Sequence, residues 1–366
     1  MSENTPGQIL DDTAAPQTRD LRIAGYRPLL PPAILMEELP LSGEGAVIVS
    51  RTRQEVVDIL DGRDDRLVVV VGPCSVHDPV AALEYARLLT EPARELASDL
   101  RIVMRVYFEK PRTTVGWRGL ISDPHLDGSY AVNDGLRMAR RLLIDVVALG
   151  LPIGCEFLDP ISPQFFADTV AWAAIGARTT ESQVHRNLAS GLSMPVGFKI
   201  GTGGGVQMAV DAVRAAARPH SFLSVTEQGL AAIVTTRSNQ DCHVVLRGGR
   251  FGPNYDVENV QRTLNLLRDA KLPPRVLIDF SHDNSGKDYR QQPVVARAVA
   301  EQIAAGEMGI FGAMMESFLV EGRQELVDKA NLVYGQSITD SCMSWETTQE
   351  VLQMLADAVR RRRAAR

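Results

Sequence analysis

The sequence predicts an α/β protein: a (β/α)8 TIM barrel with an N-terminal extension and a β-hairpin inserted before the sixth barrel strand. Three observations support this prediction. Eight apolar runs of strand length alternate with amphipathic runs of helix length from Leu67 onward. The strand runs are continuously hydrophobic, as a parallel sheet covered on both faces requires. A chain of 366 residues is long enough to form one large barrel.

The elements follow one another in a regular order. Residues 1–65 begin polar, pass through RPLLPPAIL and show a helical pattern at RTRQEVVDILDG, so we expect an N-terminal arm before a barrel domain at 66–366. The expected strands are LVVVVGPCS, RIVMRVYFEK, PIGCEFLD, AIGARTT, PVGFKIG, HVVLRGG, RVLIDFSH and GIFGAMMES. Before the sixth strand, SFLSVTEQGLAAIVTTRSN contains two short strand patterns around a Gln-Gly turn, which predicts a hairpin at about 220–241.

Composition and charge exclude several classes of protein. A net charge of -6 argues against a nucleic-acid-binding surface, which needs clustered Lys and Arg. The basic run at 360–363 is interpreted as a solvated helix end. The polar start MSENTPGQILDD does not resemble a signal peptide, and no apolar run is long enough to span a membrane. Four widely spaced cysteines fit free thiols, so we expect a cytoplasmic protein.

The strongest indication of function is the set of residues at the strand ends. Catalytic residues of such barrels gather at the carboxyl ends of the strands. The residues expected at or just after these ends are Cys74, Arg105, Lys110, Glu156, Arg178, Lys199, Arg247, His282 and Glu316. A rim that served stability alone would not be expected to collect these cations and potential metal ligands.

Some of these residues have the chemistry of a metal site. Cys74, His282 and Glu316 offer a thiolate, an imidazole and a carboxylate, and Asp340 in YGQSITDSC lies shortly after the last strand. Such a set suits one divalent ion, Mn, Fe, Co or Zn, better than Mg. The alternative for Cys74 is a small buried apolar residue at a strand end.

The cations indicate an anion pocket. Arg105, Lys110, Arg178, Lys199 and Arg247 would converge on one barrel mouth, where their mutual repulsion favours a multiply charged, phosphorylated ligand. The alternative is five separate surface ion pairs. A Gly-rich segment, GTGGG at 201–205, follows a strand and fits a tight turn better than a dinucleotide site.

Longer motifs resemble one enzyme family. GPCSVHDP, MRVYFEKPRTTVGWRGLISDPHLDGSY, GARTTESQVHR, LRGG, IDFSH and SITDSCMSWE recur in order and are similar to the type I 3-deoxy-D-arabino-heptulosonate 7-phosphate (DAHP) synthases. These enzymes open the shikimate pathway. The arm and the hairpin resemble those of the feedback-regulated branch.

The resemblance implies that phosphoenolpyruvate condenses with D-erythrose 4-phosphate and water, releasing phosphate. It implies that the metal is held by Cys74, His282, Glu316 and Asp340. It implies that phosphoenolpyruvate is surrounded by Arg105, Lys110, Glu156, Ala177, Arg178, Lys199 and Arg247. Erythrose phosphate would be bound by Pro111, Arg112 and Thr113, with Asp340 nearby. The catalytic groups would be Lys110, Glu156 and His282, and the base that activates water is either Glu156 or a water on the metal.

The resemblance also implies control and assembly. An aromatic amino acid, phenylalanine or tyrosine, is expected to bind near Gln164, Ser193, Phe222 and Ser224, and the family is commonly a homodimer or homotetramer. One departure concerns the fifth strand end, where Ile200 and Gly203 replace a usual amide and acid. The competing functions are a related phosphoenolpyruvate–aldose phosphate synthase and a non-catalytic sensor of aromatic amino acids.

Overall fold

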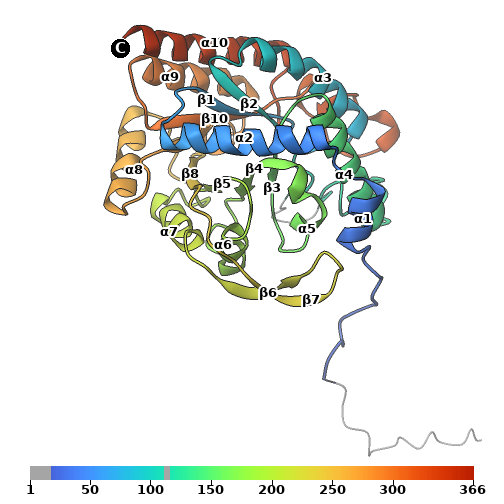
Figure 1. Cartoon of the computed structure of the whole chain (residues 1–366). Coiled ribbons are helices and arrows are strands. Elements are labelled where there is room, and N and C mark those ends of the chain that lie inside the picture. Colours follow the sequence, from blue (N-terminus) through green and yellow to red (C-terminus); the bar gives the residue numbers. More distant parts are fainter. Residues whose placement is uncertain (1–17, 111–115) are drawn as a thin grey trace, which may run out of the picture.

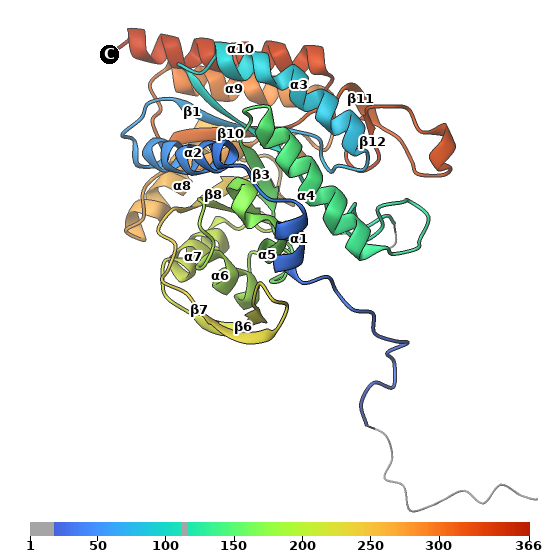
Figure 2. The ribbon, with the colours of Figure 1, turned by 45° about the vertical axis from the view of Figure 1, so that its right-hand side comes forward.

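The computed structural model describes residues 18–110 and 116–366. Eight parallel strands close into a barrel in the order β1-β10-β9-β8-β5-β4-β3-β2, and each is followed along the chain by a helix of the outer layer (Figures 1 and 2). The barrel strands are β1 (Leu67–Gly72), β2 (Leu100–Arg105), β3 (Ile153–Glu156), β4 (Val170–Ile175), β5 (Val196–Lys199), β8 (Cys242–Leu246), β9 (Val276–Asp279) and β10 (Ile310–Glu316). This arrangement confirms the predicted fold class.

The remaining elements surround the barrel. The outer helices are α3 (Pro79–Glu95), α4 (Val132–Ala148), α5 (Pro163–Phe166), α6 (Gln183–Ala189), α7 (Val206–Ala216), α8 (Val257–Asp269), α9 (Gln292–Ala304) and α10 (Trp345–Ala364). Two helices precede the barrel, α1 (Pro32–Glu38) and α2 (Gly43–Asp61). The minor strands are β6 (Ser221–Val225), β7 (Ala231–Thr235), β11 (Val320–Arg323) and β12 (Gln336–Ser337), and the short 3-10 turns are Ala167–Thr169, His282–Asn284, Tyr289–Gln291 and Lys329–Asn331.

Helix α2 packs against the apolar interior of the barrel. It begins where Ser42 accepts a hydrogen bond from the Gly45 amide and ends at Gly62, whose φ of 77° suits glycine. Its last apolar residues, Val56, Ile59 and Leu60, join a cluster of inward-facing strand residues. That cluster includes Val68, Val70, Val103, Trp172, Val245, Leu277, Phe311 and Met314. The helix therefore covers one end of the barrel (Figure 1).

The predicted hairpin is present between α7 and β8. Strands β6 and β7 pair antiparallel from Ser221 opposite Thr235 to Val225 opposite Ala231. The turn between them uses Gly229 at a φ of 77°, a conformation that glycine adopts without strain.

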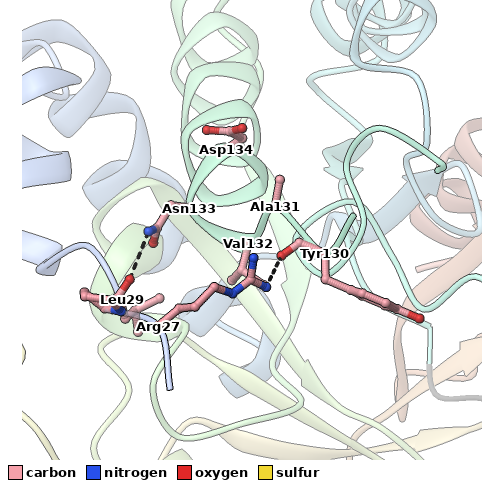
Figure 3. Close-up of a pocket in the computed structure, with 8 residues that line it drawn as sticks. Arg27, Leu29, Tyr130, Ala131, Val132, Asn133 and Asp134 are labelled. Atoms are coloured by element: carbon pink, nitrogen blue, oxygen red, sulfur yellow. Dashed lines mark hydrogen bonds between the residues drawn. The ribbon is translucent and has the colours of Figure 1, made fainter. Parts of the chain in front are cut away.

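Helix α1 contacts this hairpin, and the segment before α1 contacts the start of α4. The amide of Ala33 donates to the Glu227 carbonyl at 2.7 Å. Asn133, in the first turn of α4, accepts from the Leu30 amide. It also donates to the Pro28 carbonyl, and Arg27 donates to the Tyr130 carbonyl (Figure 3). Arg27, Tyr130 and Asn133 line a cavity of about 380 Å³, and none of the residues predicted for the site is among its lining residues.

Two expectations from the sequence need correction. The fourth strand is Val170–Ile175 rather than AIGARTT, because the buried run VAWAAI carries the ladder and the chain turns at Gly176. The basic run at 360–363 is not simply solvated. Arg362 is only 2 % exposed and donates to the Asp65 carbonyl, and Arg363 pairs with Asp65 and Asp99. The end of α10 thus anchors the chain segment before β1 and the loop before β2.

Replacing Ile59 with alanine is expected to destabilise the protein by about 2–5 kcal/mol, because it leaves a cavity between α2 and the barrel interior. Thermal and urea unfolding measure the change. The matched control is Val47→Ala on the exposed side of the same helix, which should change stability by less than about 0.5 kcal/mol. Equal effects of the two substitutions would show that α2 does not seal the barrel.

Candidate functional site

The predicted strand-end residues meet at one mouth of the barrel. The ends of β1, β2 and β10 bring the Arg105 guanidinium to 2.9 Å from the Glu316 carboxylate, and both side chains are buried. Arg105 also donates to the carbonyls of Pro73 and Cys74 at 3.1 and 3.0 Å. It thereby joins the loop after β1 to the ends of β2 and β10.

Three metal-ligand candidates form a compact cluster. One ligand atom each from Cys74, Glu316 and Asp340 lies within 4.8 Å of the other two. Lys110 lies against two of these groups, with its ammonium 3.1 Å from Cys74 Sγ and 2.9 Å from Asp340 Oδ2. A half-buried ammonium held by a thiol and a carboxylate shows that this position favours positive charge.

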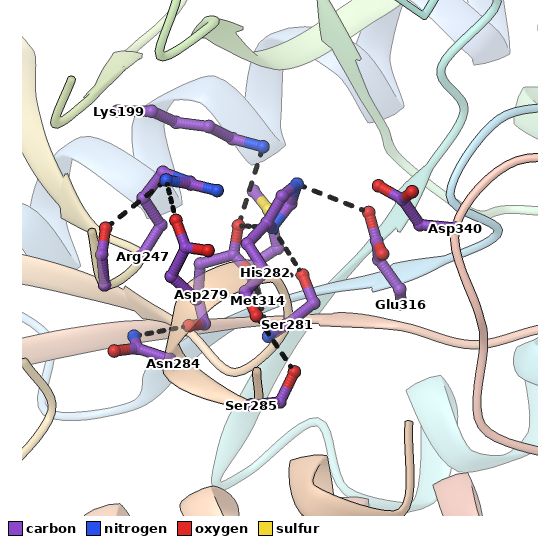
Figure 4. A network of polar contacts seen from close by, with 12 residues as sticks. Lys199, Arg247, Asp279, Ser281, His282, Asn284, Ser285, Met314, Glu316 and Asp340 are labelled. Atoms are coloured by element: carbon purple, nitrogen blue, oxygen red, sulfur yellow. Dashed lines mark hydrogen bonds and ion pairs between the residues drawn. The ribbon is translucent and has the colours of Figure 1, made fainter. Parts of the chain in front are cut away.

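The fourth candidate, His282, lies beside this cluster. Its Nε2 is 3.7 Å from Glu316 Oε1, while its Nδ1 is 2.7 Å from Ser281 Oγ and 3.1 Å from Asp279 Oδ2 (Figure 4). A carboxylate at one ring nitrogen orients the ring and directs the other nitrogen at its ligand. His282 also has a φ of 58°, an uncommon conformation outside glycine that is typical of functional positions.

The pKa values in this cluster follow from burial and charge. Burial raises the pKa of Cys74 to about 11, and Glu316 adds to that rise. Burial lowers the pKa of Lys110, but Cys74, Glu316 and Asp340 outweigh burial and hold it above its usual value. Burial lowers the pKa of His282, and Asp279 offsets this only in part. Near neutral pH the cluster therefore contains an ammonium and a neutral imidazole.

A second group of charges lies deeper in the same mouth. The Lys199 ammonium at the end of β5 is 3.5 Å from Asp279 Oδ2 and 3.8 Å from Glu156 Oε1. Burial lowers the pKa of Lys199, whereas Asp279 and Glu156 act in the opposite direction. Glycine at 176 leaves room for Glu156, because a Cβ there would lie 3.2 Å from Glu156 Oε1.

The other predicted residues occupy the same end of the barrel but differ in burial. Arg247 is buried after β8 and pairs with Asp283 at 2.7 Å. Ala177 and Arg178 lie in the turn after β4, where Ala177 is half-buried and Arg178 is exposed. Pro111, Arg112 and Thr113 fall outside the described residues. The alternative of separate surface ion pairs does not hold for Arg105, Lys199 and Arg247, because all three are buried.

Sequence reasoning missed Asp279. Its carboxylate is fully buried between Lys199 and His282, and it also accepts from Ser281 Oγ at 2.5 Å. Burial acts to raise the pKa of Asp279, but His282 and Lys199 hold it well below its usual value. An acidic residue inside the apolar run RVLIDFSH was the available indication, because a buried carboxylate requires a partner.

His77 takes no part in the cluster. It is buried after Cys74 with its ring 6.2 Å from that of Phe318, in an edge-to-face arrangement, and burial lowers its pKa. All four cysteines are free and buried. Among the described residues, no helix is long and apolar enough to cross a membrane.

Comparison with known proteins shows the family to which the chain belongs. The DAHP synthetase I family matches residues 45–353. The chain belongs to this family. It is 56 % identical over 347 residues to the Phe-sensitive phospho-2-dehydro-3-deoxyheptonate aldolase of Escherichia coli (strain K12), a match that covers 95 % of this chain and 99 % of the relative.

Further family members include eukaryotic enzymes and a solved structure. The tyrosine-inhibited phospho-2-dehydro-3-deoxyheptonate aldolase of Schizosaccharomyces pombe is 54 % identical, with 94 % of each chain covered. The structure of the phospho-2-dehydro-3-deoxyheptonate aldolase from Francisella tularensis SCHU S4 matches with a TM-score of 0.91 at 51 % identity, covering 93 % of this chain and 99 % of that one. These matches confirm the family that the sequence motifs predicted.

Asp279→Asn is expected to destabilise this family member by about 3–5 kcal/mol, because it leaves buried positive charge without its carboxylate. The low pKa of Asp279 means that its stabilising effect is complete above about pH 5 and is lost as the pH falls. Urea unfolding at pH 7 and at about pH 2.5 measures both effects, because most of the loss lies below the ordinary aspartate pKa of about 3.9, and the variant should lose less stability between these two pH values.

The matched carboxylate-to-amide control is Glu258→Gln. Glu258 pairs with Arg262 on the exposed face of α8, and such pairs contribute less than about 1 kcal/mol. An Asp279→Asn protein as stable as this control would contradict the role assigned to Asp279.

Proposed function

We propose that the protein is a 3-deoxy-7-phosphoheptulonate synthase, a transferase that condenses phosphoenolpyruvate with D-erythrose 4-phosphate and water to give DAHP and phosphate. The observation that carries this proposal is that a thiol, two carboxylates and an imidazole meet the buried cations Arg105 and Lys199 and the half-buried Lys110 at one barrel mouth. Relatives that the chain matches over nearly their whole length are named as aldolases of this product. The reaction is the first step of chorismate and aromatic amino acid biosynthesis.

Four side chains would hold one divalent metal ion: Cys74, His282, Glu316 and Asp340. Their donor set fits, because three ligand atoms already cluster and Lys110 shows that the cluster binds a cation. A thiolate and an imidazole favour Mn, Fe, Co or Zn. When bound, the metal supplies Lewis-acid polarisation of the erythrose phosphate aldehyde. Binding it requires Cys74 to lose the proton that burial otherwise retains.

The cations of the mouth would bind phosphoenolpyruvate. Arg105 and Lys199 are buried and directed by Glu316 and Asp279, so they lose little side-chain entropy when an anion binds. The same ligand would contact Lys110, Glu156, Ala177, Arg178 and Arg247. Lys110 reaches the metal cluster as well, so it would contact both substrates. Pro111, Arg112 and Thr113 remain the predicted contacts of erythrose phosphate, with Asp340.

The proposed reaction needs positive charge near the phosphate groups and one base that accepts a proton from water. The C3 carbon of phosphoenolpyruvate attacks the aldehyde carbon, a water oxygen adds to C2, and the bond from C2 to the phosphate oxygen breaks. Positive side chains stabilise the phosphate oxygens as negative charge develops. Glu156, held by Lys199, is our proposed acceptor of the first water proton, and Lys110 lies where the aldehyde oxygen takes up a proton to become a hydroxyl. The second water proton leaves as C2 becomes the ketone carbon, and the released phosphate takes it up.

An aromatic amino acid is the proposed inhibitor. The Gln164 side chain donates to the Val225 carbonyl and Ser224 Oγ donates to the Pro160 carbonyl, so the hairpin lies against the loop after β3. Ser193 and Phe222 are the other proposed contacts. Among relatives, the name of one states Phe sensitivity and that of another tyrosine inhibition.

Assembly and location complete the proposal. The outer face of the hairpin leaves Leu223 82 % and Ile233 75 % exposed, which favours burial against a second copy. We propose a homodimer or homotetramer in the cytoplasm. A monomer at micromolar concentration in light scattering would contradict the assembly.

Cys74→Ala should lose both bound metal and turnover, because it removes a ligand, whereas Lys110→Ala should retain metal and lose turnover. Each loss is expected to be about 100-fold or more in phosphate release. Metal content by mass spectrometry and phosphate release with both substrates are the two measurements. Cys242→Ala, another buried cysteine, is the control and should change neither. Full metal occupancy in Cys74→Ala would exclude Cys74 as a ligand.

Ser224→Ala is expected to weaken inhibition by an aromatic amino acid about tenfold while leaving uninhibited turnover unchanged, because it removes one polar contact. Phosphate release is measured with phenylalanine, tyrosine and tryptophan added separately. Ser221→Ala, on the exposed face of the same strand, is the matched control. Unaltered inhibition of Ser224→Ala would place the effector elsewhere.

A further inference from the structure

Tyr107 lies in the barrel mouth but is not among the residues to which the proposed function assigns a role. It follows the end of β2 and joins Trp172, Val245 and Met314 in the cluster that fills the barrel interior. Its side chain is only 2 % exposed. Tyr107 therefore belongs to the apolar cluster inside the barrel and also contacts the charged groups of the mouth.

The face of the Tyr107 ring lies against two cations of the mouth. The guanidinium carbon of Arg105 is 3.7 Å from the ring centroid, and the ammonium of Lys199 is 5.4 Å from it. Both distances are within the range of a cation–π attraction. One aromatic ring thus holds two cations that would otherwise repel each other.

The hydroxyl group of Tyr107 differs from that of the other fully buried tyrosine. Tyr85 donates to Ser317 Oγ at 3.0 Å. In contrast, no described residue offers Tyr107 Oη a hydrogen-bond partner. A buried hydroxyl without a partner costs stability, so its presence at a binding site indicates a partner of another kind.

The surroundings favour donation to an anion. Burial raises the pKa of Tyr107 well above its usual value; Arg105 opposes the rise, and Glu156 adds to it. The hydroxyl therefore keeps its proton. It lies among the same cations that converge on the predicted anion pocket.

We propose that Tyr107 is a further binding residue of this mouth: its hydroxyl donates a hydrogen bond to phosphoenolpyruvate, and its ring positions Arg105 and Lys199 against that ligand. The inference rests on the proposed function and adds one neutral donor to its charged groups. The ring and the hydroxyl make separable contributions, because phenylalanine retains the first and removes the second.

The test compares Tyr107→Phe, Tyr107→Leu and the control Tyr85→Phe with the unmodified protein. Calorimetric titration gives the Kd of phosphoenolpyruvate, phosphate release gives kcat and KM, and thermal unfolding gives Tm. Tyr107→Phe should raise Kd and KM for phosphoenolpyruvate about tenfold, with Tm unchanged or higher. Tyr107→Leu should raise KM further and lower kcat, because Arg105 and Lys199 lose the aromatic ring that positions them. Tyr85→Phe should lower Tm and leave Kd within about twofold.

Two results would overturn the inference. One is a Tyr107→Phe protein that binds phosphoenolpyruvate as tightly as the unmodified protein. The other is a Tyr107→Phe protein that loses Tm as Tyr85→Phe does, since the hydroxyl would then have a structural partner. Failure of the proposed function looks different: the unmodified protein itself would neither bind phosphoenolpyruvate nor release phosphate from it.

Discussion

The mouth of the barrel depends on the buried ion pair between Arg105 and Glu316. These residues end β2 and β10, which lie on either side of β1, and Arg105 also donates to two carbonyls in the loop after β1. Taking both charges out of water is costly, and that cost is offset only when every donor and acceptor is satisfied. Closing the barrel supplies those partners, so the fold and the charged site form together.

The same constraint extends outward through the other charges. Glu316 is held from behind by Gln292, which bonds both the backbone amide and the carbonyl of this residue. On the far side, Asp279 satisfies Lys199 and His282 together. Positive and negative groups thus alternate through the mouth, which allows several cations to lie in one buried space. A phosphorylated substrate can then be bound by groups that are already oriented, with little reorganisation.

The two ends of the barrel have different roles: one contributes to stability and the other carries the candidate site. Helix α2 covers one end, and the apolar inner cluster that it joins extends through the barrel as far as Tyr107 and supplies stability. The loops after the strands at the other end carry the polar groups, including the loop after β10 that brings Asp340 back to Cys74. Helix α1 and the inserted hairpin contact each other through Ala33 and Glu227, so two additions to the barrel lie side by side.

The sequence by itself determined the barrel and placed most of the candidate site residues at its strand ends. Continuous apolar runs alternating with amphipathic ones predicted the eight strands, and the residues at the ends of those runs included Cys74, His282 and Glu316. This succeeds because a parallel barrel places all strand ends at one mouth, so a position in the chain becomes a position in space. The location of the fourth strand was wrong, since a turn and a short strand can have similar composition.

Only the tertiary structure decided which groups touch. Asp279 and Tyr107 lie within apolar stretches that predict core, and their roles depend on neighbours from other strands, Lys199 and His282 for the first and Arg105 and Lys199 for the second. The burial of Arg362 depends in the same way on Asp65, almost three hundred residues earlier. Periodicity reports which face of an element is buried, whereas the pairing of buried polar atoms is a property of the closed fold.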